Sequence, residues 1–262
     1  MTERIWLRIA GSKSTEQVWD RFWSGRHPDT VYPPVTNIAQ ELKNTAEFAT
    51  KKILEVGAGT GRTGTEMQAS GGDVFLLDYS VQSLRMIRLS AGDTPVKVVL
   101  GDAQDCPFAS GVFDIVLHQG LLEHFPSPWA LLRENHRILK KGGLLIVDVP
   151  QTFHLYTLMK HVLMALGFWF GGWERQFTTG SLSALLRKSE FEPVRSYGDW
   201  SRPGVIYKTA RQVFAKIGVR LPMYPRYLGR LTEGYYRLQG RLRTKRLFSY
   251  TMLSIGVIAR KV

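Results

Sequence analysis

One stretch of the sequence decides the fold of this chain: Ile53-Leu54-Glu55-Val56-Gly57-Ala58-Gly59-Thr60-Gly61-Arg62. An apolar run leads straight into three alternate glycines, and an amphipathic segment follows. Glycine lets the backbone turn sharply and lets a ligand lie against bare peptide. The start of the following helix offers N–H groups without partners in the helix. The stretch therefore predicts a strand, a tight ligand-binding loop and a helix.

Short apolar runs alternate with amphipathic stretches from Lys51 to Pro150, which is typical of βαβ units and a parallel sheet. The apolar runs are rich in Val, Ile and Leu, as in strands that are covered on both faces. We expect strands at Lys52–Val56, Asp73–Leu77, Val96–Leu100, Phe113–Leu117 and Leu144–Val149. We expect helices at Arg62–Ala69, Val81–Ala91 and Pro128–Leu139, the last ended by Lys140-Lys141-Gly142-Gly143.

The flanking segments predict additions to this core. Residues 1–50 are expected to form a helical cap, 51–150 the cofactor-binding core, and 151–262 the rest of the sheet with helical inserts at 151–176 and 201–246, all in one compact unit. The cap helices are expected at Ser14–Trp23 and Asn37–Ala49. The later elements are expected as a helix at Thr179–Ser189 and strands at Phe191–Tyr197 and Phe248–Ala259.

Composition limits the class of protein. The chain has 262 residues, 44% of them hydrophobic, which suits one α/β domain with an insertion. Its one cysteine, Cys106, cannot form an intramolecular disulfide. We see no signal peptide, and the notable uncharged stretch Val162–Trp173 is too short to span a bilayer. These features predict a cytoplasmic protein.

Positive charge is concentrated in one region. The formal net charge is +13, and the segment Ser201–Arg246 contains twelve Lys or Arg residues and one acid, Glu233. That segment therefore carries eleven of the thirteen net charges. A regional excess of this kind predicts a polyanionic partner for that segment.

A nucleotide-like ligand is indicated by Asp78, which ends the second expected strand and is placed to accept hydrogen bonds from a ribose diol. A nicotinamide site would start G-x-G-x-x-G at the strand end, but Arg62 stands where the third glycine is needed after Gly57. The spacing does fit from Gly59, two residues later. A nicotinamide oxidoreductase and a ligand-free turn both remain open at this point.

Several motifs in order resemble class I S-adenosylmethionine-dependent methyltransferases, especially the small-molecule group that includes ubiquinone and menaquinone biosynthesis enzymes. The resemblance covers Lys51–Pro150. Its motifs are the glycine loop, Leu77-Asp78-Tyr79-Ser80, Gly101-Asp102-Ala103, Phe113-Asp114-Ile115-Val116, His118-Gln119-Gly120-Leu121-Leu122-Glu123-His124-Phe125 and Arg137–Ile146. Phe177-Thr178, Leu182, Leu185-Leu186 and Phe191-Glu192-Pro193-Val194 resemble the helix and sixth strand of the same group.

The resemblance implies a Rossmann-like, mostly parallel α/β sheet of seven strands with helices on both faces, the last strand being antiparallel. It implies that Asp78 binds the ribose of S-adenosyl-L-methionine, that Asp102 and the next amide hold the adenine, and that the loop after the fourth strand faces the methionine end. Glu55 is expected near the amino group. The expected cofactor-binding residues are Glu55, Gly57, Ala58, Gly59, Gly61, Asp78, Tyr79, Asp102, Ala103, His118 and Gln119, with no metal ligands.

Methyl transfer is a one-step displacement in which the protein mainly aligns the reactants and excludes water. A base is needed only where the acceptor arrives protonated. The candidates for such a catalytic base are His118, Glu123 and His124. The alternative is that Glu123 and His124 only hold the loop together through hydrogen bonds.

The additions are expected to build the acceptor site, and their aromatic residues suit a flat or apolar small molecule. These residues are Trp19, Phe22, Trp23, Phe153, Tyr156, Phe168, Trp169, Phe170 and Trp173. The leading prediction is methyl transfer to O, C or N of a lipophilic small molecule. Segments 162–173 and 201–246 are then expected to contact an anionic membrane surface.

Two other functions fit the sequence. An RNA or protein methyltransferase would use the basic segment 201–246 to hold its substrate, although no RNA-binding module is recognisable and nucleic acid is the less favoured partner. A non-catalytic S-adenosylmethionine-binding protein is the other alternative.

Overall fold

A computed structural model gives the structure of the chain. It describes residues 15–24, 37–43, 47–167, 174–200 and 229–262, together with isolated residues between 204 and 222. The helices are α2 (Glu16–Trp23), α4 (Asn37–Lys43), α5 (Arg62–Ala69), α6 (Val81–Ala91), α7 (Trp129–Ile138), α8 (Leu155–Ala165), α9 (Thr179–Lys188) and α11 (Gly229–Leu242), with 3-10 turns η1 (Leu122–His124) and η2 (Arg246–Thr251). The strands are β1 (Lys52–Val56), β2 (Asp73–Asp78), β3 (Lys97–Leu100), β4 (Phe113–Gln119), β5 (Leu139–Pro150), β6 (Phe191–Asp199) and β7 (Ser254–Lys261).

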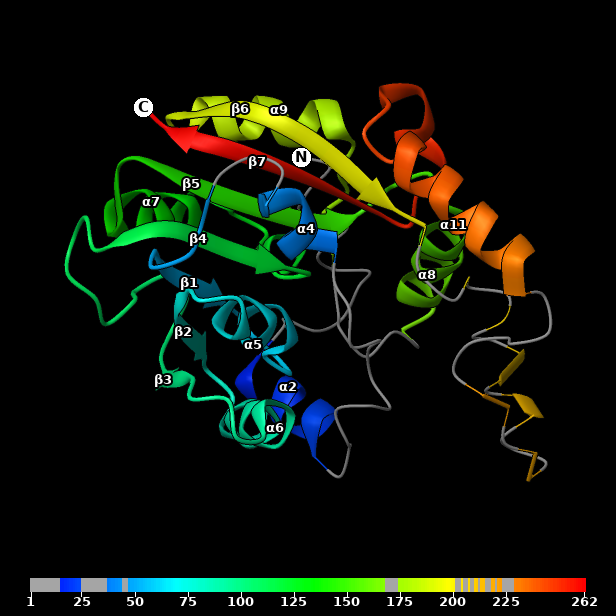
Figure 1. The fold of residues 1–262 in the computed structure, drawn as a ribbon, viewed down its shortest axis with the longest axis horizontal. Helices are drawn as coiled ribbons and strands as arrows, with labels where there is room; N and C mark the ends of the chain where they lie inside the picture. The colour runs from blue at the N-terminus through cyan, green and yellow to red at the C-terminus, as the bar shows by residue number, and fades with distance from the viewer. Residues whose placement is uncertain are drawn as a thin grey trace.

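The strands form one seven-stranded sheet in the order β3-β2-β1-β4-β5-β7-β6 (Figure 1). β1 to β5 pair in parallel, and β7 pairs antiparallel with both β5 and β6. The chain leaves β1 toward β2 on one side and later enters β4 on the other. The strand order therefore reverses between β1 and β4, and ligands bind α/β sheets outside the carboxyl ends of strands at such a point.

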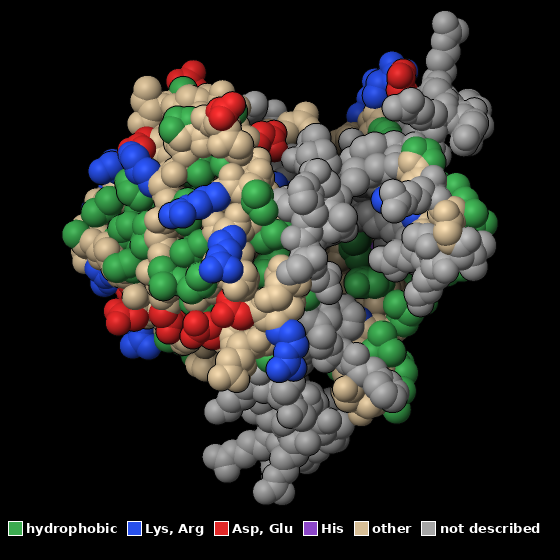
Figure 2. All heavy atoms as spheres, turned by 90° about the horizontal axis from the view of Figure 1, so that it is seen from below, with side chains coloured by type: hydrophobic (Ala, Val, Ile, Leu, Met, Phe, Trp, Pro, Cys, Tyr) green, Lys and Arg blue, Asp and Glu red, His purple; other side chains and the backbone are tan. Residues whose placement is uncertain are grey.

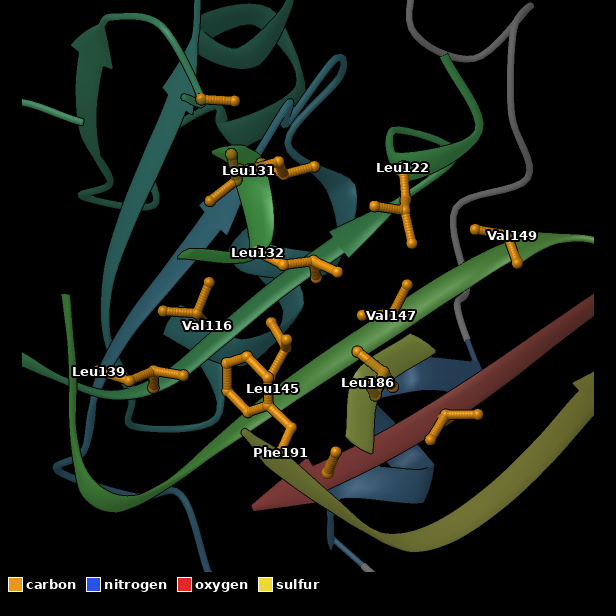
Figure 3. Close-up of a cluster of buried hydrophobic side chains, with 14 of the residues drawn as sticks. Val116, Leu122, Leu131, Leu132, Leu139, Leu145, Val147, Val149, Leu186 and Phe191 are labelled. Atoms are coloured by element: carbon orange, nitrogen blue, oxygen red, sulfur yellow. The ribbon is translucent and has the colours of Figure 1, made fainter. Parts of the chain in front are cut away.

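Two hydrophobic clusters lie on the two faces of the sheet. On one face, buried side chains of β4 and β5 pack against those of α7 and α9, as Figure 3 shows for Val116, Leu145, Leu132 and Leu186. On the other face, β1 and β2 pack against α4, α5 and α6. Because both faces are covered, the central strands consist almost entirely of apolar residues.

The expected fold is confirmed: a mostly parallel seven-stranded sheet with helices on both faces and an antiparallel last strand. The expected strands and helices of the core lie where the sequence placed them, to within a few residues. This agreement follows from the apolar runs, which leave no second way to bury the strands.

Three expectations about individual elements were wrong. Lys140–Gly143 does not end α7, which stops at Ile138; these residues instead form an irregular start of β5, where Gly142 has φ +73° and the register with β4 shifts. The helix expected to reach Ala49 is described as Asn37–Lys43, and it does not extend to residues 49 and 50, which form a turn in which Thr50 has φ +65°. The closing strand begins at Ser254 because η2 occupies residues 246–251.

The additions are tied to the sheet by a buried carboxylate. Glu41 of α4 is fully buried and pairs with Arg195 of β6 at 2.7 Å and with Arg243, just after α11, also at 2.7 Å. A buried charge requires such partners. In the described part of the chain, no helix is both long and apolar enough to cross a membrane.

Close packing between β6 and β7 generates a testable prediction. A Cβ atom on Gly256 would lie 2.1 Å from the ring of the buried Tyr197, so Gly256→Ala forces this ring to move. We expect a loss of about 1–3 kcal/mol in the free energy of unfolding, measured by urea denaturation. Gly240→Ala on α11, where a Cβ would meet nothing within 4 Å, is the control and should not destabilise. Equal stability of the two variants would contradict the packing described here.

Candidate functional site

The carboxyl ends of β1 and β2 meet at a hydrogen-bonded junction. Asp78, the last residue of β2, accepts the backbone N–H of Gly59 through Oδ2 at 2.9 Å and that of Ser80 through Oδ1 at 3.0 Å. Burial raises the pKa of the Asp78 carboxyl, although these hydrogen bonds oppose the shift. Asp78 therefore holds the glycine loop against the start of α6.

The glycine loop needs glycine for its conformation and for space. Gly57, Gly59 and Gly61 have φ of +64°, +58° and +67°. A side chain is strained at such angles. A Cβ atom would also lie 2.8 Å from Leu121 at Gly57 and 3.0 Å from Trp23 at Gly59. Glycine is thus required in the loop both for its left-handed backbone and for the close packing of Leu121 and Trp23 against it.

Glu55, in β1, supports the helix that follows this loop. Its Oε2 accepts the N–H of Gly64 at 2.8 Å, in the first turn of α5, so it satisfies one of the helix's open donors. Burial raises the pKa of the Glu55 carboxyl to about 7. One carboxylate oxygen of Glu55 is therefore used by α5. The role of Glu55 near the amino group of the methyl donor stays a prediction.

Helix α2 covers the glycine loop. Trp23 is buried and its ring lies over Gly59, while Trp19 contacts His124 with ring centroids 5.0 Å apart. Asp20 accepts a hydrogen bond from the Ser80 hydroxyl and, at 3.4 Å, from the N–H of Gln82. One short helix therefore spans the site from the start of α6 to the loop after β4.

The third-strand turn lies at the same edge of the sheet. Asp102 is exposed, and its Oδ1 accepts the N–H of Gln104 at 2.8 Å, whereas Ala103 is buried. Tyr79 is partly buried after β2. The Asp102 carboxylate is thus accessible to solvent. The adenine contact that the resemblance implies for Asp102 stays a prediction.

A polar chain crosses from α5 to β5. Arg62 donates to Oε1 of Gln119 at 2.8 Å, and Gln119 donates through Nε2 to Asp148 at 3.4 Å. Burial raises the pKa of the Asp148 carboxyl to about 7. His118, by contrast, is fully buried in β4; its ring nitrogens have no hydrogen-bond partner among the described residues, and burial lowers its pKa to about 3.

The loop after β4 meets the insert after β5. Glu123 is buried in η1; burial and the Glu174 carboxylate raise its pKa to about 8, while the Lys160 cation opposes this shift. Lys160 of α8 forms a buried ion pair with Glu174. Burial lowers the pKa of His124 to about 4, so its imidazole is neutral. Glu123 and His124 thus lie together beside α2 and α8.

The expected acceptor residues are only partly described. Trp19, Phe22 and Trp23 pack edge-to-face or stacked in α2, beside the loop after β4. Phe153 is exposed and Tyr156 is partly buried at the start of α8. Phe168, Trp169, Phe170 and Trp173 lie outside the described residues, as does most of segment 201–228. Across the described residues, no three His, Cys, Asp or Glu side chains gather as a metal site requires.

Sequence reasoning missed several residues that shape this site. Asp20, Lys160 and Glu174 were not candidates, because their partners are distant in the chain. A signal existed for Asp148: like Glu55, it is a lone acid in an apolar strand, and such an acid is costly to bury without a purpose. Arg62 was noted only as a break in a glycine pattern, yet it contacts Gln119.

Comparison with known proteins identifies the core. Residues 54–147 match the family model described as a methyltransferase domain. The chain is 32% identical over 149 residues to a chloroplastic 2-methyl-6-phytyl-1,4-hydroquinone methyltransferase of Oryza sativa, covering 52% of this chain and 45% of that protein. It is 28% identical over 166 residues to a ubiquinone biosynthesis O-methyltransferase of Ruegeria pomeroyi, covering 61% of this chain and 67% of that protein. The chain thus spans less than half the length of the rice relative.

Solved structures agree on the fold. An S-adenosylmethionine-dependent methyltransferase from Thermotoga maritima superposes with a TM-score of 0.55 at 21% identity, over 86% of this chain and 87% of that one. At this identity the likeness concerns the fold. Together with the domain match, it confirms that the chain has a methyltransferase domain with the class I fold, as the motifs from Lys51 to Pro150 predicted.

The raised pKa of Glu123 generates a prediction about stability. In the folded protein Glu123 holds its proton up to a pH of about 8, but in the unfolded chain only to about 4.3. Its contribution to stability is therefore complete at low pH and is lost as the pH rises through about 8. Glu123→Gln mimics the protonated form, so its free energy of unfolding should gain on wild type between about pH 5 and 8, by up to about 1.4 kcal/mol per pH unit.

Urea denaturation across this pH range measures the difference, and Glu134→Gln is the control of opposite sign. The hydrogen bond from Arg137 lowers the pKa of Glu134, so this variant should lose stability at neutral pH and not in acid. A difference between Glu123→Gln and wild type that does not change with pH would show that Glu123 is ionised in the folded protein.

Proposed function

We propose that this chain, a class I S-adenosylmethionine-dependent methyltransferase by its domain and fold, transfers a methyl group to a lipophilic hydroquinone-type molecule. The observation that carries this proposal is the junction of the glycine loop with Asp78 at the carboxyl edge of the sheet. The methyltransferase names of both relatives support the reaction.

The residues present suit the methyl donor. The glycine loop at Gly57, the first turn of α5 and the buried Asp78 carboxylate would provide contacts for a ribose and its neighbours. Asp102 and the amide of Ala103 stand at the next strand end for the adenine. When bound, S-adenosylmethionine supplies a methyl group on a positively charged sulfur.

Charge at the site also suits a cationic ligand. Glu55, Asp148 and Glu123 are buried near this edge, and burial raises the pKa of each carboxyl to about 7, 7 and 8. A cation placed among them would favour their ionised forms. We expect donor binding to release protons from these carboxyls, which would leave Glu123 ionised when the acceptor arrives.

The acceptor is proposed from the relatives and from the site together. The rice relative is named for a phytylated hydroquinone, and the Ruegeria relative for ubiquinone biosynthesis. Methylation of a hydroquinone releases one proton: the hydroxyl proton when oxygen is methylated, and the ring C–H proton when carbon is methylated, where ionisation of the hydroxyl first activates the ring. Glu123 and His124 face the additions at the expected methyl-donor end, and Glu123, with the higher pKa, is the stronger base of the two. Its carboxylate would accept that proton.

For the additions, we propose an anionic membrane surface as partner, at the cytoplasmic side, where the single buried Cys106 would stay reduced. The concentration of positive charge in 201–246 supports an anionic partner of some kind. An RNA or protein substrate held by the same segment is the second candidate, and the charge alone favours it equally.

Removal of the Asp78 carboxylate tests the donor site. Asp78→Ala deletes the acceptor of the Gly59 and Ser80 amides, so we expect S-adenosylmethionine affinity, measured by isothermal titration calorimetry, to fall about 10- to 100-fold. Asp73→Ala is the control, because Asp73 begins the same strand at the opposite edge and forms a surface ion pair with Lys97. Unchanged affinity in Asp78→Ala would refute the proposed ribose site, and tight binding of a nicotinamide dinucleotide in its place would refute the donor.

Methyl transfer from labelled S-adenosylmethionine identifies the acceptor class. The protein is incubated with a whole-cell extract, which is then divided into lipid, small-molecule, RNA and protein fractions, and in parallel with a prenylated hydroquinone. We expect label in the lipid fraction and in the hydroquinone. Label confined to RNA or protein would replace the proposed acceptor, and tight donor binding without S-adenosylhomocysteine formation would indicate a non-catalytic protein.

A further inference from the structure

Helix α8 is built with its polar side inward. Its buried residues are Thr157, Lys160 and Met164, whereas Leu155, Val162 and the capping residue Leu166 are 79%, 58% and 61% exposed. A helix on the surface of a globular protein normally buries its apolar stripe. α8 instead buries two polar residues beside a single methionine and leaves most of its leucine and valine side chains exposed.

A buried ion pair fixes this orientation. Lys160 is almost fully buried and pairs with Glu174, which is equally buried in the segment before α9. Removing one partner of such a pair leaves an uncompensated charge, so rotation of α8 about its axis is strongly unfavourable. The apolar residues on the other side of the helix are therefore kept outside.

The outward residues form one continuous stripe. Their spacing of three and four residues places them on a single helix face. Phe153, just before the helix, is also exposed and contacts Tyr250 of η2, with ring centroids 6.1 Å apart. We call this set the α8 stripe; it comprises Phe153, Leu155, Leu158, Met159, Val162 and Leu166, and it continues onto η2 through Tyr250 and Leu247.

Positive charge borders this surface. α8 itself contains no acidic residue and no exposed cation. α11 carries the exposed Arg237 and Arg241 with one exposed acid, Glu233, and the exposed Lys245 directly precedes η2. Figure 2 shows exposed hydrophobic side chains on the right-hand side of the molecule, the side on which α8 and α11 lie in Figure 1. An apolar face with flanking cations is the pattern of a helix that lies in the interface of an anionic bilayer.

We propose that the α8 stripe docks on the surface of an anionic lipid bilayer, with the basic residues of α11 over the lipid headgroups. The surface expected from the sequence, 162–173 with 201–246, shares Val162, Leu166 and the basic residues of α11 with this one, and the stripe adds the residues from Phe153 to Met159. Docking would serve the proposed function and rests on it for its purpose, because a lipophilic acceptor resides in a bilayer. Docking itself, however, requires neither donor nor acceptor.

A bilayer accounts for the surface better than a second copy of the chain does. A self-interface between two like faces would bring the flanking cations of both copies together without a counter-charge on α8. An anionic bilayer supplies both an apolar layer for the stripe and negative headgroups for those cations. The charge complementarity therefore selects the lipid surface.

Vesicle binding tests this docking. The whole protein is sedimented with vesicles of phosphatidylcholine alone and of phosphatidylcholine mixed with phosphatidylglycerol. We expect clear binding only to the anionic vesicles, and a loss of about tenfold for each of Leu155→Gln and Val162→Gln. Leu89→Gln on α6 is the matched control, since Leu89 is 64% exposed and lies outside the stripe. Calorimetry with S-adenosylmethionine on the same variants should give unchanged donor affinity, which separates docking from the proposed function.

A fluorescent label reports contact with lipid directly. Cys106 is buried, so an environment-sensitive dye would react selectively with an introduced Leu155→Cys or Leu89→Cys. We expect the emission to shift to the blue on addition of anionic vesicles only for the label at 155. Equal binding by the stripe variants and wild type, equal binding to neutral vesicles, or a label that shifts at both positions would overturn the proposal. So would stripe variants that change a dimer into a monomer while wild type ignores vesicles.

Discussion

The site depends on the hydrogen bonds between one carboxylate and two backbone amides. Asp78 ends β2, yet it organises residues of three elements: Gly59 in the loop after β1, Ser80 at the start of α6 and, through that serine, Asp20 of α2. Its hydrogen bond to Gly59 acts together with that from the Ser83 hydroxyl to the Gly59 carbonyl to hold the glycine loop in place. The carboxylate therefore links the position of the ligand-binding loop to the position of the helix above it.

Much of the core could be predicted from sequence because its signals are local. An apolar run, three spaced glycines and an acid at the next strand end each restrict the backbone within a few residues, so β1, α5, β2 and Asp78 were placed correctly. The start of β5 was wrong for a reason of the same kind. The sequence Lys140–Gly143 is typical of a helix end, but these residues belong to the start of β5, where the register with β4 shifts.

The rest of the site could not be predicted because it consists of contacts between distant segments. Nothing near Lys160 in the chain indicates that it is buried; its partner Glu174 comes from beyond a segment that the structure does not describe. The same holds for Asp20 and Ser80, sixty residues apart. Such pairs are decided by how the additions pack on the core, which no local sequence pattern indicates. The position of the glycine loop and of Asp78 in the fold could therefore be predicted from the sequence, whereas the contacts among the additions could not.

Helix α2 makes only two turns, which is below the length at which a lone helix is stable in water. It is helical because Trp23 rests on Gly59, Trp19 on His124 and Asp20 on Ser80. Without these three contacts, α2 would be too short to remain helical. Exposure of the glycine loop would then require local unfolding of α2, which gains conformational entropy. A rise in temperature would therefore favour the uncovered site before the sheet unfolds.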